Sequence, residues 1–532
     1  MGSEETVSFP HADAPTVLLF VAADCPVCGE VFPALTQLRD TLQSKAAVHM
    51  ISQDEEMLED EHDMNRRLAR GCFLPHHADI AFPVFDDSKL AASLRWAPEV
   101  LPALVTLDPS GEEVGRVEGW ERAEWEAEVP RVSELLGSPH PPIAWGELPP
   151  HLEGCGSKHG FLDAGGSSFV SRQVTVGDED DIFEFMADAG FTDGLPVVPP
   201  TPERVARMLK GTIRDPTEII ARVPPLYGDA TVEKIAVNAV MAGCKPEYMP
   251  VILAALEAIC TDTFNCHGVW ATTMSAAPVM VINGPVRDKI GLNSGRNALG
   301  SGMENRANLT IGRAIKLIVQ NVGGAKPGFS EMATVGAATK NFATCFGERE
   351  ERGEGWAPLH VERGFEAGDS VVTCIALTSC VLLNDQTSRT AQQLAGTFAA
   401  ALKASWSNRS AGLADTLLLV CPEHYDTFRR DNWDKRMLRD YIYQHSAVSA
   451  DELVNDEEMG GSGFVNTPDG LAKAIEAGKG RPMPKFREVN EAGDFGLSIV
   501  LAGGDAGKFS YFFSGWAGGA MGSIPTSERI ES

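Results

Sequence analysis

Residues 16–42 carry two hydrophobic patterns in succession. The run "TVLLFVAA", residues 16–23, is almost continuously apolar and short, which favours a buried central strand over a helix. After it, Phe32, Leu35, Leu38 and Leu42 recur at intervals of three and four residues, the spacing of one helix face. The sequence therefore predicts a strand that leads directly into an amphipathic helix.

Strand and helix patterns continue to about residue 137. The segment "VHMISQD" predicts a second strand, "FPVFDDSKLAASLRW" a short strand and a helix, and "EVLPALVTLDPSGEEVGRVEGW" a hairpin of two strands. Strands interleaved with helices indicate an α/β domain, which we expect to occupy residues 1–137.

The pattern changes twice after this domain. Residues 138–176 are rich in Pro, Gly and Ser and lack periodicity, which predicts a linker or an extended segment that wraps over a surface. From residue 177 onward, helical patterns such as "VEKIAVNAVMAG" alternate with apolar strand patterns such as "APVMVING" and "LSIVLAGG". We expect residues 177–532 to form one large α/β or α+β domain, as a single body or in two lobes.

Composition narrows the classes of partner. The 532 residues carry a formal net charge of -29, which argues against binding to nucleic acid or to an anionic membrane surface. No apolar run reaches the ~18 residues that a membrane span needs, and the acidic N-terminus is unlike a secretory signal. We therefore expect a cytoplasmic protein, in which the eleven cysteines are mainly free thiols rather than a disulfide scaffold.

The clearest chemical signal is the pair Cys25 and Cys28 at the predicted strand-to-helix corner. Because a helix N-terminus stabilises a thiolate, we expect Cys25 to be a nucleophile and Cys28, one turn on, to resolve the mixed disulfide. Asp24 opposes a strongly lowered pKa of Cys25. Half a zinc knuckle and a structural cysteine pair are the alternatives, but a zinc site would need a second CxxC, which the sequence lacks.

These residues resemble the thioredoxin superfamily, specifically its TlpA-like branch of thiol-disulfide oxidoreductases, over roughly residues 10–137. The resemblance rests on the CxxC after the first strand, on "FPVFDD", and on Leu101-Pro102 before the strand "ALVTLD". It implies that Pro102 follows a cis peptide bond, faces the two cysteines and positions the substrate. The chain departs from the family's pattern at Asp24 and Pro26-Val27, where Trp and Gly-Pro are commoner, and this puts the redox potential in doubt.

Other cysteines lie outside this motif. Cys155, in the flexible "GCGS" of the predicted linker, is either a shuttle of oxidising equivalents between the CxxC and the second domain or an incidental loop thiol. Cys72, His76 and His77 lie in an acidic insert, where an exposed helical segment is favoured over a metal site. We therefore expect no bound metal.

In the second domain, two cysteines occupy turns that precede helices. Cys244 stands beside Lys245 in "AGCKPEYMPV", a setting that lowers the pKa of a thiol. Cys266 is adjacent to His267, although neighbours in sequence seldom form a nucleophile–base pair. We expect Cys244 or Cys266 to be the nucleophile of this domain.

Glycine- and arginine-rich segments indicate where an anion could bind. We expect the cationic side chains of these segments to hold a carboxylate or phosphate, with tight turns as the alternative role of the glycines; they are Arg296, Arg306, Arg313 and Lys326. "LAGGDAGKFS" is unlike a phosphate-binding loop, since Ala502 and Phe509 replace required residues. His360, with Glu362 and Arg363, is a further candidate acid–base or anion-binding group, with a structural histidine as the alternative.

The segments "FTDGLPVVPPTPERV", "AGCKPEYMPV" and "GGDAGKFS" are similar to an uncharacterised bacterial family associated with the UGSC group of cysteine or selenocysteine proteins. The similarity spans most of residues 177–532 and implies thiol or selenol chemistry, without a substrate or catalytic residues. The UGSC motif is absent in its cysteine form, CGSC; only "GCGS" occurs, at 154–157.

Together these features predict a thiol-disulfide oxidoreductase in which the CxxC delivers reducing equivalents to a thiol-dependent second domain that acts on a small molecule. The expected cofactor is the dithiol itself, and the expected reductant is a thioredoxin reductase-like protein or a low-molecular-weight thiol. A C-terminal hydrolase or lyase with the first domain used for docking, and a redox-regulated binding or assembly protein, remain alternatives. The sequence also leaves self-association into a homo-oligomer open.

Overall fold

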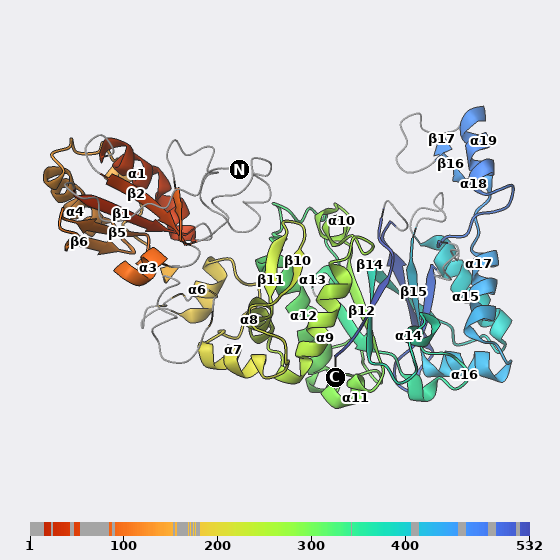
Figure 1. Ribbon diagram of the computed structural model, residues 1–532. Helices are drawn as coiled ribbons and strands as arrows, with labels where there is room; N and C mark the ends of the chain where they lie inside the picture. The colour runs from red at the N-terminus through yellow and green to blue at the C-terminus, as the bar shows by residue number, and fades with distance from the viewer. Residues whose placement is uncertain are drawn as a thin grey trace. The chain divides into compact units, whose positions relative to one another are not determined.

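The computed structural model describes most of the chain and divides it into two compact units, Met1–Gly190 and Phe191–Ser532 (Figure 1). The described residues are 15–22, 25–42, 47–53, 84–87, 91–152, 155–156, 169, 171, 174, 176, 181–341, 343–405, 414–455, 464–465, 467–487, 496–517 and 522–531. The candidate metal ligands Cys72, His76 and His77 lie outside these residues.

The first unit is built on a five-stranded sheet of order β3-β2-β1-β5-β6. β1, β2 and β3 run parallel, whereas β5 is antiparallel to β1 and β6 to β5. All six residues of β1 are buried, as the apolar run predicts for a central strand. The strands are β1 (Thr16–Val21), β2 (Ala47–Ser52), β3 (Val84–Asp86), β5 (Ala103–Leu107) and β6 (Glu113–Glu118).

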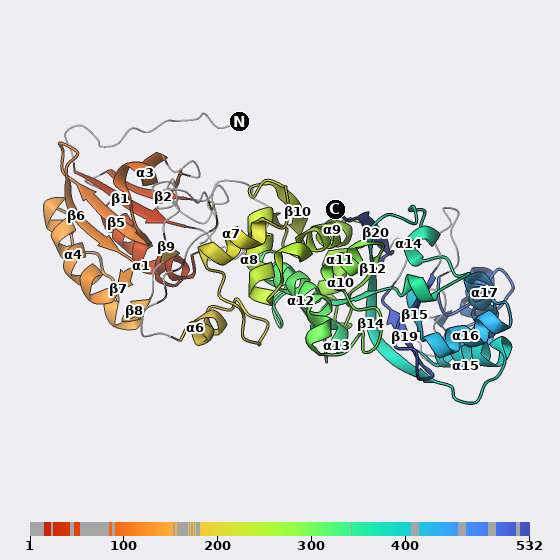
Figure 2. The ribbon, with the colours of Figure 1, turned by 90° about the horizontal axis from the view of Figure 1, so that it is seen from below.

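Helices α1 (Pro26–Leu42), α3 (Ala91–Trp96) and α4 (Arg122–Leu135) complete this unit (Figure 2). The apolar stripe of α1 packs on β1 and β5 in one core that also contains Trp120 and Trp125. The predicted α/β fold is confirmed, and this arrangement of a CxxC helix directly after a central strand is thioredoxin-like.

Part of the segment predicted as a linker or surface wrap belongs to the first unit. Here β8 (His151–Leu152) pairs with β7 (Trp120–Glu121), and Ile143 and Leu148 pack on the core. Further along, β9 (Cys155–Gly156) pairs antiparallel with β4 (Val100–Leu101). This segment contains the 3-10 turn η3 (Trp145–Glu147), and the helix α6 (Ile182–Asp188) follows it within the first unit. The described part of this segment therefore runs over the surface of the first unit.

The second unit contains a seven-stranded sheet with an internal repeat. Its order is β13-β12-β14-β19-β15-β18, with β20 beside β14. In each half, a parallel pair is followed by an antiparallel strand: β12, β13 and β14 in the first half, and β15, β18 and β19 in the second. The two antiparallel strands, β14 and β19, pair with each other and join the halves.

The sheet strands are β12 (Ala277–Asn283), β13 (Thr344–Gly347), β14 (Val371–Asn384), β15 (Thr416–Val420), β18 (Leu497–Leu501), β19 (Phe509–Gly515) and β20 (Thr526–Arg529). Smaller ribbons pair β10 (Ile219–Val223) with β11 (Gly228–Thr231), and β16 (Val454–Asn455) with β17 (Phe464–Val465).

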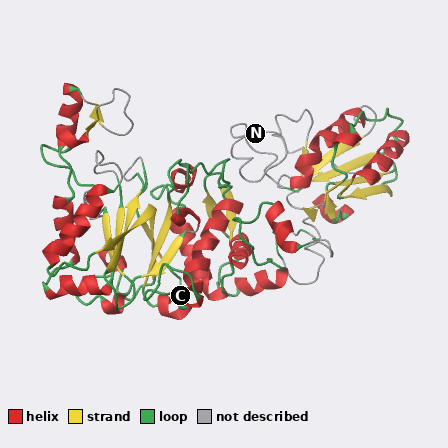
Figure 3. Cartoon of the chain, turned by 180° about the vertical axis from the view of Figure 1, so that it is seen from behind, coloured by secondary structure: helices red, strands yellow, loops and turns green. Residues whose placement is uncertain are grey.

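The period-two pattern of the strands explains how the halves pack. Leu417 and Leu419 of β15 join Val279 and Val281 of β12 in one apolar cluster, so both halves of the sheet contribute side chains to it. The alternate residues of β15, such as Leu418, point to a second cluster with α15 and α17. Two groups of helices accordingly flank the strands (Figure 3).

The helices of the second unit are α7 (Pro202–Leu209), α8 (Val232–Ala242), α9 (Met249–Ile259), α10 (Cys266–Ala271), α11 (Val286–Ile290), α12 (Arg306–Asn321), α13 (Ala338–Asn341), α14 (Leu359–Glu362), α15 (Ala391–Ala404), α16 (Pro422–Arg430), α17 (Lys435–His445), α18 (Ala450–Leu453) and α19 (Pro468–Ala477). Single 3-10 turns lie at η4 (Pro246–Tyr248), η5 (Met303–Asn305) and η6 (Glu350–Arg352). Across the described ranges, none of the helices combines the length and apolar character needed to cross a membrane.

Candidate functional site

Cys25 and Cys28 lie where β1 passes into α1. The N–H of Cys25 donates to the carbonyl of Ala22 at 3.2 Å, which closes the turn, and the N–H of Cys28 donates to Cys25 Sγ at 3.3 Å. The first turn of α1 carries no acidic side chain. An N–H donor and a helix N-terminus both favour the thiolate of Cys25 over its thiol.

Cys25 and Cys28 are not joined in a disulfide, and both thiols are fully buried, each with 0% of its surface exposed. A buried thiol does not meet an external disulfide directly. Reaction with an external substrate therefore requires a covering segment to move.

Strand register gives the position of Pro102 relative to the strand that leads to the cysteines. The Leu101-Pro102 peptide bond is cis, so this prediction is confirmed. In the antiparallel pairing of β1 and β5, Phe20 lies opposite Ala103, the residue after Pro102. Pro102 is therefore at the end of β1 from which the chain continues to Cys25.

The same end of the sheet includes the backbone of Cys155. In the β4–β9 pair, Leu101 lies opposite Cys155 and Val100 opposite Gly156. Opposed residues in an antiparallel ladder have Cα atoms about 5 Å apart. The fold thus brings a third cysteine of the first unit next to the residue that precedes Pro102, although the two are 54 positions apart in sequence.

Cys244 does not have the environment that its neighbour Lys245 indicates. Its side chain is buried and donates to the carbonyl of Thr310 at 3.2 Å, whereas Lys245 is exposed. Burial raises the pKa of Cys244 to about 12. The expectation of a lowered pKa is therefore wrong, because loss of water around the thiol outweighs the hydrogen bond to Thr310 and the charges of Arg306 and Arg313.

Cys266 forms a pair that the sequence reasoning missed. It begins α10, is buried, and is hydrogen-bonded to the half-buried thiol of Cys260; burial raises the pKa of Cys266. His267 instead stacks its ring on Tyr227, with centroids 6.1 Å apart. The missed signal is the six-residue spacing of the cysteines across the turn between α9 and α10.

The predicted cationic residues do not converge on one site. Arg306 donates to the carbonyl of Gly243, and Arg313 pairs with Asp193 at 2.7 Å. Lys326 and Arg296 are exposed. Arg296 lines a cavity of about 370 Å³ together with Arg349, so only one of the four residues belongs to it.

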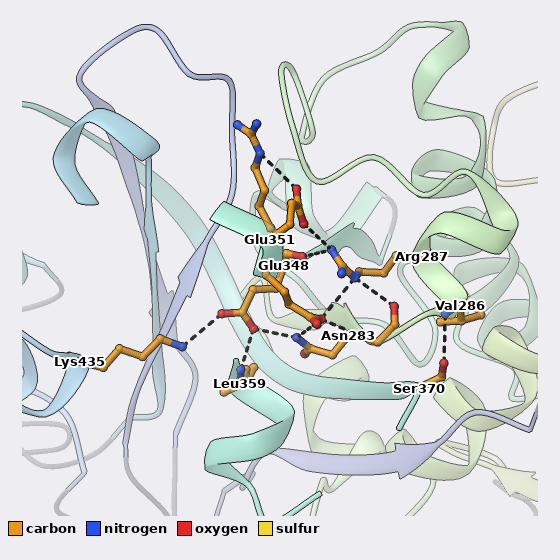
Figure 4. Close-up of polar contacts among 11 residues, drawn as sticks. Asn283, Val286, Arg287, Glu348, Glu351, Leu359, Ser370 and Lys435 are labelled. Carbon is orange, nitrogen blue, oxygen red and sulfur yellow. Dashed lines mark hydrogen bonds and ion pairs between the residues drawn. The ribbon is translucent and has the colours of Figure 1, made fainter. Parts of the chain in front are cut away.

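Glu348 is the centre of a buried network of hydrogen bonds and ion pairs that the sequence did not predict (Figure 4). One carboxylate oxygen of Glu348 accepts from Asn283 Nδ2 at 2.8 Å and from the Leu359 N–H at 2.7 Å, and the other lies 3.2 Å from Lys435 Nζ. Arg287 donates to the carbonyl of Glu348. These contacts fix the end of β13 to helices α14 and α17.

The predicted acid–base group at His360 is not assembled. His360 is fully buried and neither ring nitrogen has a hydrogen-bond partner among the described residues. Glu362 pairs with Lys435 and Arg439, whereas Arg363 donates to Ser527. Within the same described ranges, no group of three or more His, Cys, Asp or Glu side chains could hold a metal ion.

Comparisons with known proteins give partial likenesses. No protein-family model and no curated protein matches the chain. Among solved structures, StoA from Bacillus subtilis is 19% identical with a TM-score of 0.18, covering 21% of this chain and 80% of its own. A secreted disulfide oxidoreductase of Mycobacterium tuberculosis is 19% identical with a TM-score of 0.16, covering 20% and 72%. The exposed lipoprotein thioredoxin Etrx1 of Streptococcus pneumoniae is 18% identical with a TM-score of 0.18, covering 23% and 85%. Each likeness concerns less than a quarter of this chain.

Proposed function

We propose that the chain is a thiol-disulfide oxidoreductase in which Cys25 and Cys28 supply reducing equivalents to a thiol-dependent second unit acting on a small molecule. The observation that carries this proposal is the 3.3 Å contact from the Cys28 N–H to Cys25 Sγ at the start of α1. It supports a thiolate at Cys25 and a resolving thiol within one helical turn.

The reaction is two successive exchanges. The Cys25 thiolate attacks one sulfur of a substrate disulfide, so a Cys25–substrate disulfide forms and the other substrate sulfur leaves as a thiolate that takes up a proton. Cys28, as its thiolate, then attacks Cys25 Sγ, which forms the Cys25–Cys28 disulfide and releases the second substrate thiol. Two electrons pass from the dithiol to the substrate, and a low-molecular-weight thiol or a reductase restores the dithiol.

Cys155 is the first acceptor in this proposal. Its support is the β4–β9 pairing, which brings the backbone of Cys155 beside Leu101 and hence to the CxxC end of the sheet. In this step the Cys25 thiolate attacks a mixed disulfide that Cys155 has formed with an oxidised thiol of the second unit. A Cys25–Cys155 disulfide forms, the second-unit sulfur leaves as a thiol, and Cys28 then attacks Cys25 Sγ and releases the Cys155 thiol. Both CxxC thiols are buried, and β9 is paired at the same end of the sheet. We therefore propose that β9 also covers the two thiols.

In the second unit, the pair Cys260–Cys266 is a better acceptor than Cys244. Two adjacent thiols can exchange between dithiol and disulfide, and Cys260 is only half-buried. Cys244 is a single buried thiol with a raised pKa. Among the described cysteines of the second unit, we therefore choose Cys260 and Cys266 as the electron acceptor because their sulfurs are in contact. The lysine beside Cys244 does not decide this choice.

The test uses the full chain and a glutathione disulfide substrate with a fluorescent reporter. We expect Cys25→Ser to remove reduction of the substrate, and Cys28→Ser to accumulate a mixed disulfide detectable by intact mass. Cys380→Ser, which removes an exposed thiol of β14, is the matched control and should leave the rate unchanged. Wild-type protein that does not reduce the substrate, or Cys25→Ser protein that still does, would refute the proposal.

The link to the second unit needs its own measurement. Protein whose cysteines have been oxidised to disulfides is treated with one equivalent of dithiothreitol, quenched in acid at timed intervals and mapped by mass spectrometry. We expect the Cys260–Cys266 disulfide to be reduced in the wild type, with a Cys25–Cys155 disulfide as an intermediate, and to persist in Cys155→Ser. If the Cys260–Cys266 disulfide is reduced equally fast in Cys155→Ser, Cys155 is not the shuttle.

A further inference from the structure

The cavity of the second unit lies where the two repeated halves meet. The N–H of Arg349, just after β13, donates to the carbonyl of Leu501 at the end of β18, at 2.7 Å. The two halves also end alike. The N–H of Glu348, just after β13, donates to the carbonyl of Ile282 in β12, and the N–H of Ala502, just after β18, donates to the carbonyl of Val420 in β15. The carboxyl ends of parallel strands are the usual place for a ligand in α/β sheets.

Three loops form the walls of this cavity of about 370 Å³. One follows α11, one follows β13 and one follows β18. The lining residues are Leu292, Asn293, Ser294, Gly295, Arg296, Arg349, Glu351, Gly504 and Asp505.

Close backbone contacts hold these loops together. The Gly503 N–H donates to the carbonyl of Ser294 at 2.9 Å, and Arg349 Nη1 donates to the carbonyl of Gly503, also at 2.9 Å. A Cβ added to Gly504 would lie 3.3 Å from the Cβ of Arg296. The segment that fails as a phosphate-binding loop, "LAGGDAGKFS", therefore has a different use: its glycines let it pack against the Arg296 loop.

The two arginines of the cavity differ in what they already bind. Arg349 is held by both carboxylate oxygens of Asp505, at 3.0 and 3.1 Å, and by Glu351 at 3.4 Å. These hydrogen bonds hold the pKa of Asp505 below its usual range. Arg296 is exposed and forms no ion pair with a described residue. Its guanidinium is thus the cation of this cavity that remains available.

The two acidic side chains of the cavity, Glu351 and Asp505, place a second requirement on the ligand. Each carboxylate oxygen of Glu351 and Asp505 already has an arginine partner. The two side chains are nevertheless 62% and 65% exposed, and a carboxylate oxygen has two lone pairs, so each can accept a further hydrogen bond. A ligand that carries only negative charge would be repelled by them. A ligand with an anionic end and a hydroxyl or amino end satisfies both sides.

We propose that this cavity binds a small organic acid that also carries hydroxyl or amino groups. Its carboxylate or phosphate pairs with Arg296, and its hydroxyl or amino hydrogens are donated to Glu351 and Asp505. None of the described residues that line the cavity is a cysteine. The proposal names the small-molecule site that the proposed function requires, but binding here does not depend on the dithiol.

Isothermal titration on the full chain tests this with five named probes. Serine, glycerate and glycerol 3-phosphate combine an anion with donors, glycerol lacks the anion, and inorganic phosphate lacks the organic hydroxyl or amino end. We expect at least one of the first three to bind, and glycerol and inorganic phosphate to bind at least tenfold more weakly. Glycerate against glycerol 3-phosphate tells a carboxylate ligand from a phosphate ligand.

Two variants make the test specific. Arg296→Ala removes the unpaired cation and should weaken binding about 10- to 100-fold, the range for a hydrogen bond to a charged group. Lys289→Ala removes an equal charge from the nearby surface outside the cavity and should leave binding unchanged. Circular dichroism confirms that both variants are folded.

The outcomes separate this proposal from the redox proposal. Binding that survives in Cys25→Ser and Cys28→Ser protein supports a site independent of the dithiol, even if no disulfide is reduced. If none of the five probes binds the wild type at 10 mM, or if Arg296→Ala binds as tightly as Lys289→Ala, the cavity is not the proposed site.

Discussion

Leu101 and Cys155 lie opposite each other in an antiparallel pair, although the sequence separates them by a helix, a hairpin and a proline-rich segment. Leu101 precedes Pro102 at the end of the sheet that holds the CxxC. The strand β9 therefore pairs with β4 at the end of the sheet that leads to the dithiol of the first unit.

Weakening this pair should make the dithiol more reactive. Gly156→Pro removes the N–H of Gly156 and restricts Cys155, so β9 should leave the β4 edge. Since both CxxC thiols are buried, we expect reduction of an external disulfide to become faster by severalfold. Stopped-flow kinetics with the fluorescent glutathione disulfide measure the change.

The control for this variant is Gly146→Pro, which alters the same surface segment in η3, at a glycine with open space around it. Its rate should match the wild type. Equal rates for Gly156→Pro and Gly146→Pro would show that β9 does not cover the dithiol.

The buried thiols of the second unit should resist alkylation in the folded protein. Burial raises the pKa of Cys244 to about 12, so its thiolate is scarce at pH 8, and iodoacetamide reaches buried sulfur slowly. We expect Cys244 and Cys374 to react at least 100-fold more slowly than the exposed Cys380. Peptide mass spectrometry after timed quenching gives the rates, and all three should become equal in guanidinium chloride.

Lys340 should give the stability a distinctive pH dependence. It is buried and lies beside Trp270 and Lys316, with Glu331 as its carboxylate partner; loss of solvation lowers its pKa to about 8. Between pH 8 and its ordinary pKa of about 10.4, the unfolded chain binds more protons at this lysine than the folded chain, so stability rises with pH.

The measurement is the free energy of unfolding in urea at pH 7.5, 9 and 10 for the wild type and Lys340→Met. We expect the wild type to gain stability relative to the variant as the pH rises, by up to roughly 3 kcal/mol, since one pKa unit is about 1.4 kcal/mol. Lys289→Met, a change at an exposed lysine, should show no such trend. A constant difference between wild type and Lys340→Met would mean that Lys340 keeps its ordinary pKa.

The buried pair Glu348 and Lys435 should be costly to break singly. Glu348→Leu leaves the Leu359 N–H without its acceptor, and the Asn283 amide keeps only its bond to Glu350. The change also removes one of the two carboxylates beside Lys435. We expect a loss of about 3–5 kcal/mol in the free energy of unfolding. The double variant Glu348→Leu/Lys435→Met should lose less than the sum of the single variants, and a strictly additive result would contradict this coupling.

The sequence by itself determined the local parts of this protein. The apolar run of β1 and the helical spacing after it predicted a buried strand and an amphipathic helix, and together with Leu101-Pro102 they indicated the thioredoxin-like arrangement around Cys25 and Cys28. These features follow from residues close in sequence, where strand and helix periodicities act directly.

Only the tertiary structure decided which distant residues meet. The pairing of Leu101 with Cys155, the contact of Cys260 with Cys266 and the cavity of Arg296 and Arg349 depend on strand order and loop packing, which periodicity does not encode. The pKa of Cys244 shows the same limit, since its neighbour Lys245 predicted a lowered value and burial by remote segments raised it. The physical reason is that solvation and long-range contact are properties of the packed chain rather than of its neighbouring residues.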